Sequence, residues 1–171
     1  MPFVCFVVKF FLTAIPTNML LIFELADEDA TTRLGAVIAH LLQAGDAVCL
    51  WGPLGAGKST LARGLVRALT RADEEVPSPT FTLVQFYETA DFSLAHLDLY
   101  RLTRPDEVEE IGLDEALDDG AVVIEWPERL EGRLPADRLD VEIAVAGEGV
   151  GDHRVARLTP HGAWEGRTIE F

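Results

Sequence analysis

One short segment constrains this chain more than any other part of its sequence. Gly52 to Ser59 reads GPLGAGKS and matches the phosphate-binding pattern G-x-x-x-x-G-K-[ST]. An apolar run from Asp46 to Trp51 precedes the segment, and a helix-like run from Ser59 to Thr70 follows it. A strand, a glycine turn and a helix N-terminus in this order direct several backbone N–H groups and the helix dipole at one anionic group. The segment therefore predicts a loop that binds the phosphates of a nucleotide.

Individual residues of this loop have separate expected roles. The glycines allow backbone turns that a Cβ would block. Lys58 is expected to reach the β- and γ-phosphates, and the Ser59 hydroxyl to ligate Mg²⁺. The chain has one other lysine, Lys9, and otherwise uses arginine for positive charge. The residues expected to hold the nucleotide are Leu54, Gly55, Ala56, Gly57, Lys58, Ser59 and Thr60.

Length and charge narrow the class of protein. A chain of 171 residues is most simply one domain around a single core. Fourteen basic against twenty-nine acidic residues give a net charge of −15, which disfavours direct binding of nucleic acid or of an anionic membrane. Eight carboxylates lie between Asp106 and Asp119, where Gly112 is expected to separate two short helices. That acidic segment is either a solvated helical face or a docking surface for a basic partner.

The two cysteines indicate the cellular compartment, and the first residues indicate where the domain begins. Cys5 and Cys49 lack the spacing of a disulfide framework or metal site, which indicates the cytoplasm, and Cys49 is expected to be a buried thiol. Residues 2–15 are apolar, but Lys9 interrupts them, and they fit neither a membrane span nor a secretory signal. We interpret residues 1–18 as a non-native or disordered extension and residues 19–171 as one domain.

The rest of the chain predicts an α/β fold. Helices alternate with strands early in the chain and antiparallel pairs follow, which predicts a P-loop NTPase-like architecture: a mixed, mostly parallel sheet with flanking helices and antiparallel hairpins. The tail, residues 159–171, shows little pattern. The expected strands are residues 20–25, 46–51, 81–87, 93–100, 121–125, 138–145 and 153–158, and the expected helices are residues 29–42 and 59–70.

A phosphate loop needs a second acid at the end of a neighbouring strand to hold Mg²⁺ or its water. Asp98 and Glu125 each follow an apolar strand-like run and are both candidates, because Mg²⁺ prefers hard oxygen ligands. Thr80 follows two prolines, in the position where a loop hydroxyl can sense the γ-phosphate. His96 reads as a core or hydrogen-bonded residue, and Arg101 as an exposed arginine that could instead steady a carboxylate or phosphate.

Four motifs in this order resemble the TsaE family. They are Gly52 to Thr60, Pro77 to Val84 (PSPTFTLV), His96 to Arg101 (HLDLYR) and Ile124 to Pro127 (IEWP). Three of the four are not shared by phosphate-loop proteins generally, so the resemblance, which covers residues 19–129, is specific. TsaE is the small bacterial ATPase required for the threonylcarbamoyladenosine modification of tRNA.

The resemblance implies a role for each matched position. The loop would bind ATP, Ser59 and Glu125 would hold Mg²⁺, and Asp98 would be needed for activity. Thr80 matches a switch-like segment, so the candidate catalytic residues are Lys58, Thr80, Asp98 and Glu125.

The resemblance also implies partners and a neighbour of the metal site. Trp126 matches the tryptophan beside the metal-binding acid. Members of this family dock on TsaB and TsaD and use ATP turnover to reset that complex.

Two other functions share the same loop. A small-molecule kinase would need an arginine-rich lid, whereas the region after Asp98 is acidic. A nucleotide-gated binding module with negligible turnover would use the acidic segment as its contact face. ATP is favoured over GTP because the guanine-binding pattern N-K-x-D is absent from the sequence.

Overall fold

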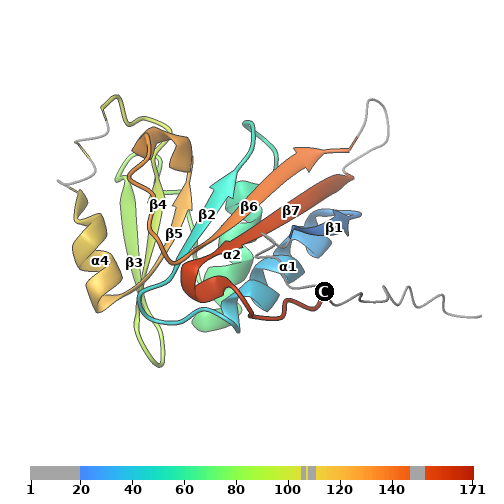
Figure 1. Cartoon of the computed structure of the whole chain (residues 1–171), viewed down its shortest axis with the longest axis horizontal. Coiled ribbons are helices and arrows are strands. Elements are labelled where there is room, and N and C mark those ends of the chain that lie inside the picture. The colour runs from blue at the N-terminus through green and yellow to red at the C-terminus, as the bar shows by residue number, and fades with distance from the viewer. Residues whose placement is uncertain (1–19, 105–106, 108–110, 147–152) are drawn as a thin grey trace, which may run out of the picture.

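The structure, a computed structural model, describes residues 20–104, 107, 111–146 and 153–171. The predicted extension, residues 1–18, lies outside the described residues. Within them, a seven-stranded sheet has the order β1-β7-β6-β2-β5-β4-β3 (Figure 1). The strands are β1 (Leu21–Leu25), β2 (Ala47–Trp51), β3 (Val84–Glu88), β4 (Ser93–Asp98), β5 (Gly120–Glu125), β6 (Arg138–Val145) and β7 (Arg154–His161). The helices are α1 (Glu28–Ala39), α2 (Lys58–Leu69) and α4 (Leu113–Asp119), with short 3-10 helices η1 (Pro127–Leu130) and η2 (Gly162–Trp164).

The centre of the sheet is parallel and its borders are antiparallel. Strands β6, β2, β5 and β4 are parallel neighbours. Strand β3 pairs antiparallel with β4, and β7 pairs antiparallel with both β6 and β1. The predicted α/β class, the mixed sheet and the β3–β4 hairpin are therefore confirmed. Because the central strands share a direction, their carboxyl ends meet at one edge of the sheet.

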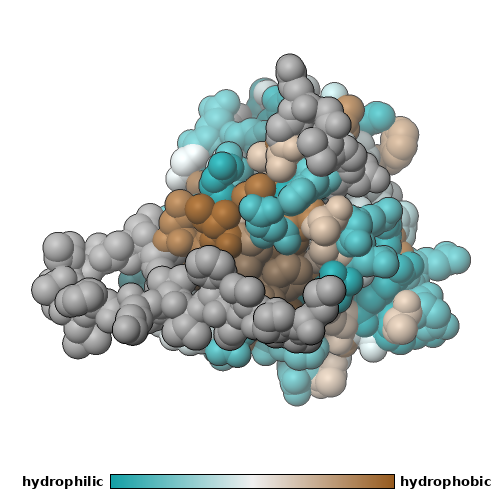
Figure 2. Space-filling view, turned by 90° about the vertical axis from the view of Figure 1, so that its right-hand side faces the viewer, coloured by the Kyte–Doolittle hydropathy of each residue, from teal (hydrophilic) through white to brown (hydrophobic). Residues whose placement is uncertain are grey.

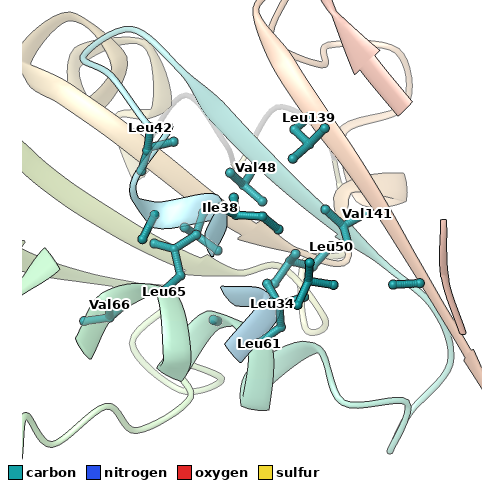
Figure 3. Packing of buried hydrophobic residues seen from close by; sticks show 14 of the residues in the cluster. Leu34, Ile38, Leu42, Val48, Leu50, Leu61, Leu65, Val66, Leu139 and Val141 are labelled. Carbon is teal, nitrogen blue, oxygen red and sulfur yellow. The ribbon is translucent and has the colours of Figure 1, made fainter. Parts of the chain in front are cut away.

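Both faces of the central strands are buried, with alternate residues on opposite faces. In β2, Val48 and Leu50 pack toward α1 and α2, as Figure 3 shows, while Ala47 and Cys49 pack in a second cluster with residues of α4 and η1. Cys49 is fully buried, and that burial raises the pKa of its thiol far above the usual range. The expectation of a buried core thiol is confirmed.

Helices α1 and α2 approach closely because glycines lie at their contact. A Cβ on Gly35 of α1 would collide with the Leu61 carbonyl oxygen of α2. A Cβ on Gly64 of α2 would likewise collide with the Thr32 carbonyl oxygen of α1. The backbones of the two helices therefore touch directly, which fixes α2, and the loop before it, relative to α1.

The substitution Gly35→Ala is expected to destabilise the protein by about 1–3 kcal/mol, because the added methyl group meets rigid backbone. Helix propensity alone predicts the opposite change, a gain in stability of about 1 kcal/mol for alanine over glycine. Urea denaturation of the two proteins measures the difference. Ala36→Ser, one residue further and partly exposed, is the control and should change stability by about 0.5 kcal/mol or less. A more stable Gly35→Ala protein would contradict the close contact.

Strand β3 starts later, and strand β4 ends earlier, than the sequence predicts. Strand β3 begins at Val84 instead of residue 81, because Leu83 has a positive φ of 65° and donates its N–H to the Pro79 carbonyl at 2.7 Å. Strand β4 ends at Asp98 instead of residue 100, because the Asp98 carboxylate accepts the Tyr100 N–H at 3.0 Å and turns the chain. Side-chain and turn hydrogen bonds have replaced the expected strand pairing at both ends.

The first helix and the last strand also differ from their predicted bounds. Helix α1 begins after Asp27, whose side chain accepts the Ala30 N–H at 2.7 Å, and it ends at Ala39 instead of residue 42. The tail is ordered into the core: β7 runs to His161 and the Trp164 side chain is fully buried. Arg167 then donates to the Leu41 carbonyl at 2.9 Å and pairs with Asp46. The tail therefore closes one end of the core, although its sequence shows little pattern.

One end of the molecule exposes apolar side chains. Figure 2 views the molecule from the β1 end and shows hydrophobic surface gathered there. Ile22 is 58% exposed and Phe171 is 46% exposed, and β1 is a border strand of the sheet. An apolar patch on a border strand is typical of a contact surface.

Among the described residues, no helix has the length and apolar character that crossing a membrane requires.

Candidate nucleotide-binding site

The glycine loop leaves the carboxyl end of β2 and runs into the N-terminus of α2. Gly55 and Gly57 have φ values of 78° and 110°, which side-chain-bearing residues rarely adopt. Gly57 is the N-cap of α2 and brings no side chain to cap it. The first N–H groups of this twelve-residue helix are therefore available to an anion, supported by the helix dipole. This geometry can cradle phosphate oxygens.

Lys58 lies folded over this loop. Its Nζ donates to the carbonyl oxygens of Gly52 at 2.6 Å and Pro53 at 2.9 Å, and it stands 3.7 Å from the centroid of the Trp126 ring. Burial lowers the pKa of the Lys58 ammonium below its usual range, and the nearby Glu125 carboxylate is the largest effect that opposes this shift. A cation with so little water around it can interact strongly with a phosphate.

Ser59 and Glu125 meet at the base of the loop. The Ser59 Oγ donates to the Glu125 Oε2 at 2.8 Å, although the two residues are far apart in sequence. Glu125 ends β5, the parallel neighbour of β2, and only 2% of the residue is exposed. A hydroxyl and a carboxylate at this distance form a hard-oxygen pair of the kind that Mg²⁺ binds. These two residues fit the metal ligands that the sequence predicts.

Asp98 and Thr80 belong to a second network beside this pair. Asp98 is opposite Glu125 in the β4–β5 register. Its Oδ2 accepts from the Thr80 Oγ1 at 2.8 Å and from the Ser78 Oγ at 2.6 Å. Its Oδ1 accepts the Tyr100 N–H. Asp98 therefore binds the proline-containing loop and holds the Thr80 hydroxyl in the cleft.

One cleft of about 520 Å³ contains these groups. It brings Lys58 together with Thr80, Asp98 and Glu125, the four candidate catalytic residues. It also includes every predicted nucleotide-binding residue except Ala56, which is 1% exposed and packs in the hydrophobic core. The residues that line it are Glu28, Thr31, Leu54, Gly55, Gly57, Lys58, Ser59, Thr60, Ser78, Thr80, Asp98, Tyr100, Glu125, Trp126 and Arg154.

Sequence reasoning did not assign a role to several cleft residues. The Ser78 hydroxyl shares Asp98 with Thr80, and its position between two prolines is the signal that could have indicated it. Tyr100 packs on Trp126 with ring centroids 4.9 Å apart. Thr31 and Arg154 come from α1 and β7, and no local sequence pattern links either of them to the loop.

His96 and Arg101 lie where the sequence predicts, in the core and at the surface. His96 is fully buried and hydrogen-bonded, with its Nε2 2.9 Å from the Glu125 Oε1. Arg101 is exposed and its guanidinium stands 4.1 Å from the centroid of the Phe81 ring. Arg101 is not among the residues that line the cleft.

A glycine loop between a central parallel strand and a helix N-terminus, with acids at the ends of the next two parallel strands, defines an α/β protein with a P-loop-type fold. Residues 25–154 match the sequence model of the family described as "Threonylcarbamoyl adenosine biosynthesis protein TsaE". The chain therefore belongs to the TsaE family, which acts in the biosynthesis of threonylcarbamoyladenosine in tRNA.

Individual relatives agree with this assignment. The chain is 40% identical over 141 residues to the tRNA threonylcarbamoyladenosine biosynthesis protein TsaE of a Nostoc species, covering 80% of this chain and 83% of the relative. It is 37% identical over 124 residues to the TsaE protein of Rickettsia felis, covering 72% of each chain. A solved structure titled "Crystal structure of Bacillus subtilus YdiB" superposes with a TM-score of 0.69 at 30% identity, covering 84% of this chain and 87% of that one. The family resemblance seen in the four motifs is confirmed.

Proposed function

We propose that this protein is a Mg²⁺-dependent ATPase whose turnover drives or resets a complex of TsaB-type and TsaD-type proteins during threonylcarbamoyladenosine synthesis on tRNA. The observation that carries the proposal is the 2.8 Å contact between Ser59 and Glu125, at the foot of an uncapped helix that follows a glycine loop. Membership of a tRNA-modification family supports a role in threonylcarbamoyladenosine synthesis and, with it, a location in the cytoplasm.

The residues of the cleft suggest how the reaction would be assisted. The loop N–H groups and Lys58 would bind the β- and γ-phosphates and stabilise the charge that develops on them. Ser59 and Glu125 would hold Mg²⁺, which when bound neutralises phosphate charge. Asp98 would keep the Thr80 hydroxyl, 2.8 Å away, facing the cleft. Positioning and electrostatic stabilisation account for most of the catalysis in phosphoryl transfer.

The charge of the chain argues against independent tRNA binding. At a net charge of −15, the surface repels the phosphate backbone. Contact with tRNA is therefore expected to be made by partner proteins.

Phosphate release from Mg-ATP tests the proposal. The purified protein is assayed alone, then with purified TsaB-type and TsaD-type proteins, with Lys58→Ala as the blank. Slow release alone that increases with both partners is the expected result. Bound nucleotide with no response to the partners would contradict the complex-driving role and direct the search to a metabolite acceptor, as in a kinase.

A further inference from the structure

His96 is a buried polar residue to which the proposed reaction assigns no role. It lies on β4 opposite Val123 of β5, and Val123 packs in the core cluster beneath α1 and α2. Glu125 is two residues after Val123, so its side chain points to the same face of the sheet. His96 is 0% exposed and Glu125 is 2% exposed. The two side chains meet below the cleft, on the side away from solvent.

The two oxygens of the Glu125 carboxylate have different partners. Oε2 faces the cleft and accepts from the Ser59 hydroxyl at 2.8 Å. Oε1 faces the core and lies 2.9 Å from the His96 Nε2. A cation bound by the Ser59 oxygen would contact Oε2, where the hydroxyl hydrogen now lies. The contact between Oε1 and the His96 Nε2 would remain. His96 can therefore hold the carboxylate whether or not a metal is bound.

The imidazole has Glu125 as its one polar partner among the described residues. Its second nitrogen, Nδ1, is buried without a hydrogen-bond partner there. A hydrogen on Nε2 suits this environment, since Nε2 then donates to the carboxylate and that buried donor is satisfied. Burial of a polar ring costs free energy, and the charge-assisted hydrogen bond to Glu125 offsets that cost.

We infer that His96 is a positioning residue, which fixes the Glu125 carboxylate so that Oε2 points to Ser59 and to a divalent cation bound there. The inference rests on the proposed function, because it concerns the same metal site. Loss of hydrogen-bonding partners behind a metal ligand commonly reduces metal affinity 10- to 100-fold. A purely structural role for His96 would lower stability without changing the requirement for Mg²⁺.

The substitutions His96→Met and His96→Gln form a matched pair. The two new side chains have similar length, but only glutamine carries an N–H group that can reach Oε1. Methionine adapts readily to buried sites, which favours a folded protein. The matched control is His161→Leu, which removes another histidine–carboxylate contact, 2.8 Å from Asp140 and outside the cleft.

The experiment measures binding of a fluorescent, non-hydrolysable ATP analogue, first in EDTA and then during titration with Mg²⁺. In His96→Met, the Mg²⁺ concentration at half-effect is expected to rise about 10- to 100-fold, while binding in EDTA stays as in the wild type. His96→Gln is expected to restore most of the Mg²⁺ affinity, and His161→Leu to leave it unchanged. Thermal denaturation checks the fold of each variant, and His96→Ala replaces His96→Met if the latter does not fold.

The outcomes separate this inference from the proposed function. A folded His96→Met protein with the wild-type Mg²⁺ requirement overturns the role of His96 and leaves the ATPase proposal intact. An equal rise in His96→Met and His96→Gln also overturns it, because the N–H group would then be irrelevant. Wild-type protein whose nucleotide binding ignores Mg²⁺ overturns the proposed function itself.

Discussion

Replacing Lys58 by alanine is expected to abolish nucleotide turnover while leaving the fold intact. In the structure, the Lys58 ammonium is held 2.6 Å from the Gly52 carbonyl oxygen and 2.9 Å from that of Pro53. A nucleotide would take over these contacts with its phosphate oxygens. Because Lys58 is only 5% exposed, water screens its charge weakly, and the loss of that charge should reduce turnover at least about 100-fold.

The measurement for Lys58→Ala is phosphate release from Mg-ATP, together with thermal denaturation to check the fold. The control is Lys9→Ala, which removes the chain's other lysine and leaves the loop sequence unchanged. Turnover by Lys58→Ala within a fewfold of wild type would contradict the placement of the nucleotide over this loop. Equal losses in both lysine variants would indicate a general effect of charge.

The central strands could be predicted because their patterns are local. Strand β6 runs over residues 138–145 as expected, since its apolar and polar residues alternate. Strand β5 begins at Gly120, one residue before the predicted start, and all of its residues are buried. Apolar runs and the alternation of apolar and polar residues indicate which residues are buried. For a buried strand, that information nearly determines where the strand begins and ends.

Predictions failed where tertiary contacts replaced local patterns. The tail has no periodicity because single residues anchor it: Trp164 fills the core, and Arg167 binds Asp46. The start of β3 depends on a turn at Leu83 that propensity does not indicate. The order of strands also depends on distant pairing, so the place of β7 between β1 and β6 could not be read from the sequence.

The candidate site divides in the same way. The glycine loop, with Lys58 and Ser59, is a local motif and could be predicted residue by residue. The strand-then-acid pattern left Asp98 and Glu125 both open as metal ligands, and only the family resemblance assigned Glu125, because the choice depends on which strand is the neighbour of β2. Strand β5 is that neighbour, so Glu125 meets Ser59, while Asp98 on β4 holds the loop that carries Thr80.

Replacing Glu125 by alanine is expected to remove the effect of Mg²⁺ on nucleotide binding. The loop N–H groups and Lys58 remain, so nucleotide should still bind in EDTA. Without Glu125, Ser59 has lost the carboxylate that lies 2.8 Å from its hydroxyl, and a single hydroxyl is a weak site for a divalent cation. Turnover should fall at least about 100-fold, since metal binding contributes several kcal/mol to stabilising charge in the transition state.

Glu128→Ala is the matched control for the Glu125 substitution. Glu128 is three residues further, exposed, and its carboxylate also acts on the Lys58 ammonium, but no hydrogen bond joins it to Ser59 among the described residues. Both variants therefore remove negative charge near Lys58, and only Glu125→Ala removes the metal ligand. Because alanine also leaves the buried His96 without its partner, Glu125→Gln is measured beside it to separate loss of the ligand from loss of stability. An unchanged Mg²⁺ dependence in a folded Glu125→Ala protein would remove this residue from the metal site and make Asp98 the acid to test.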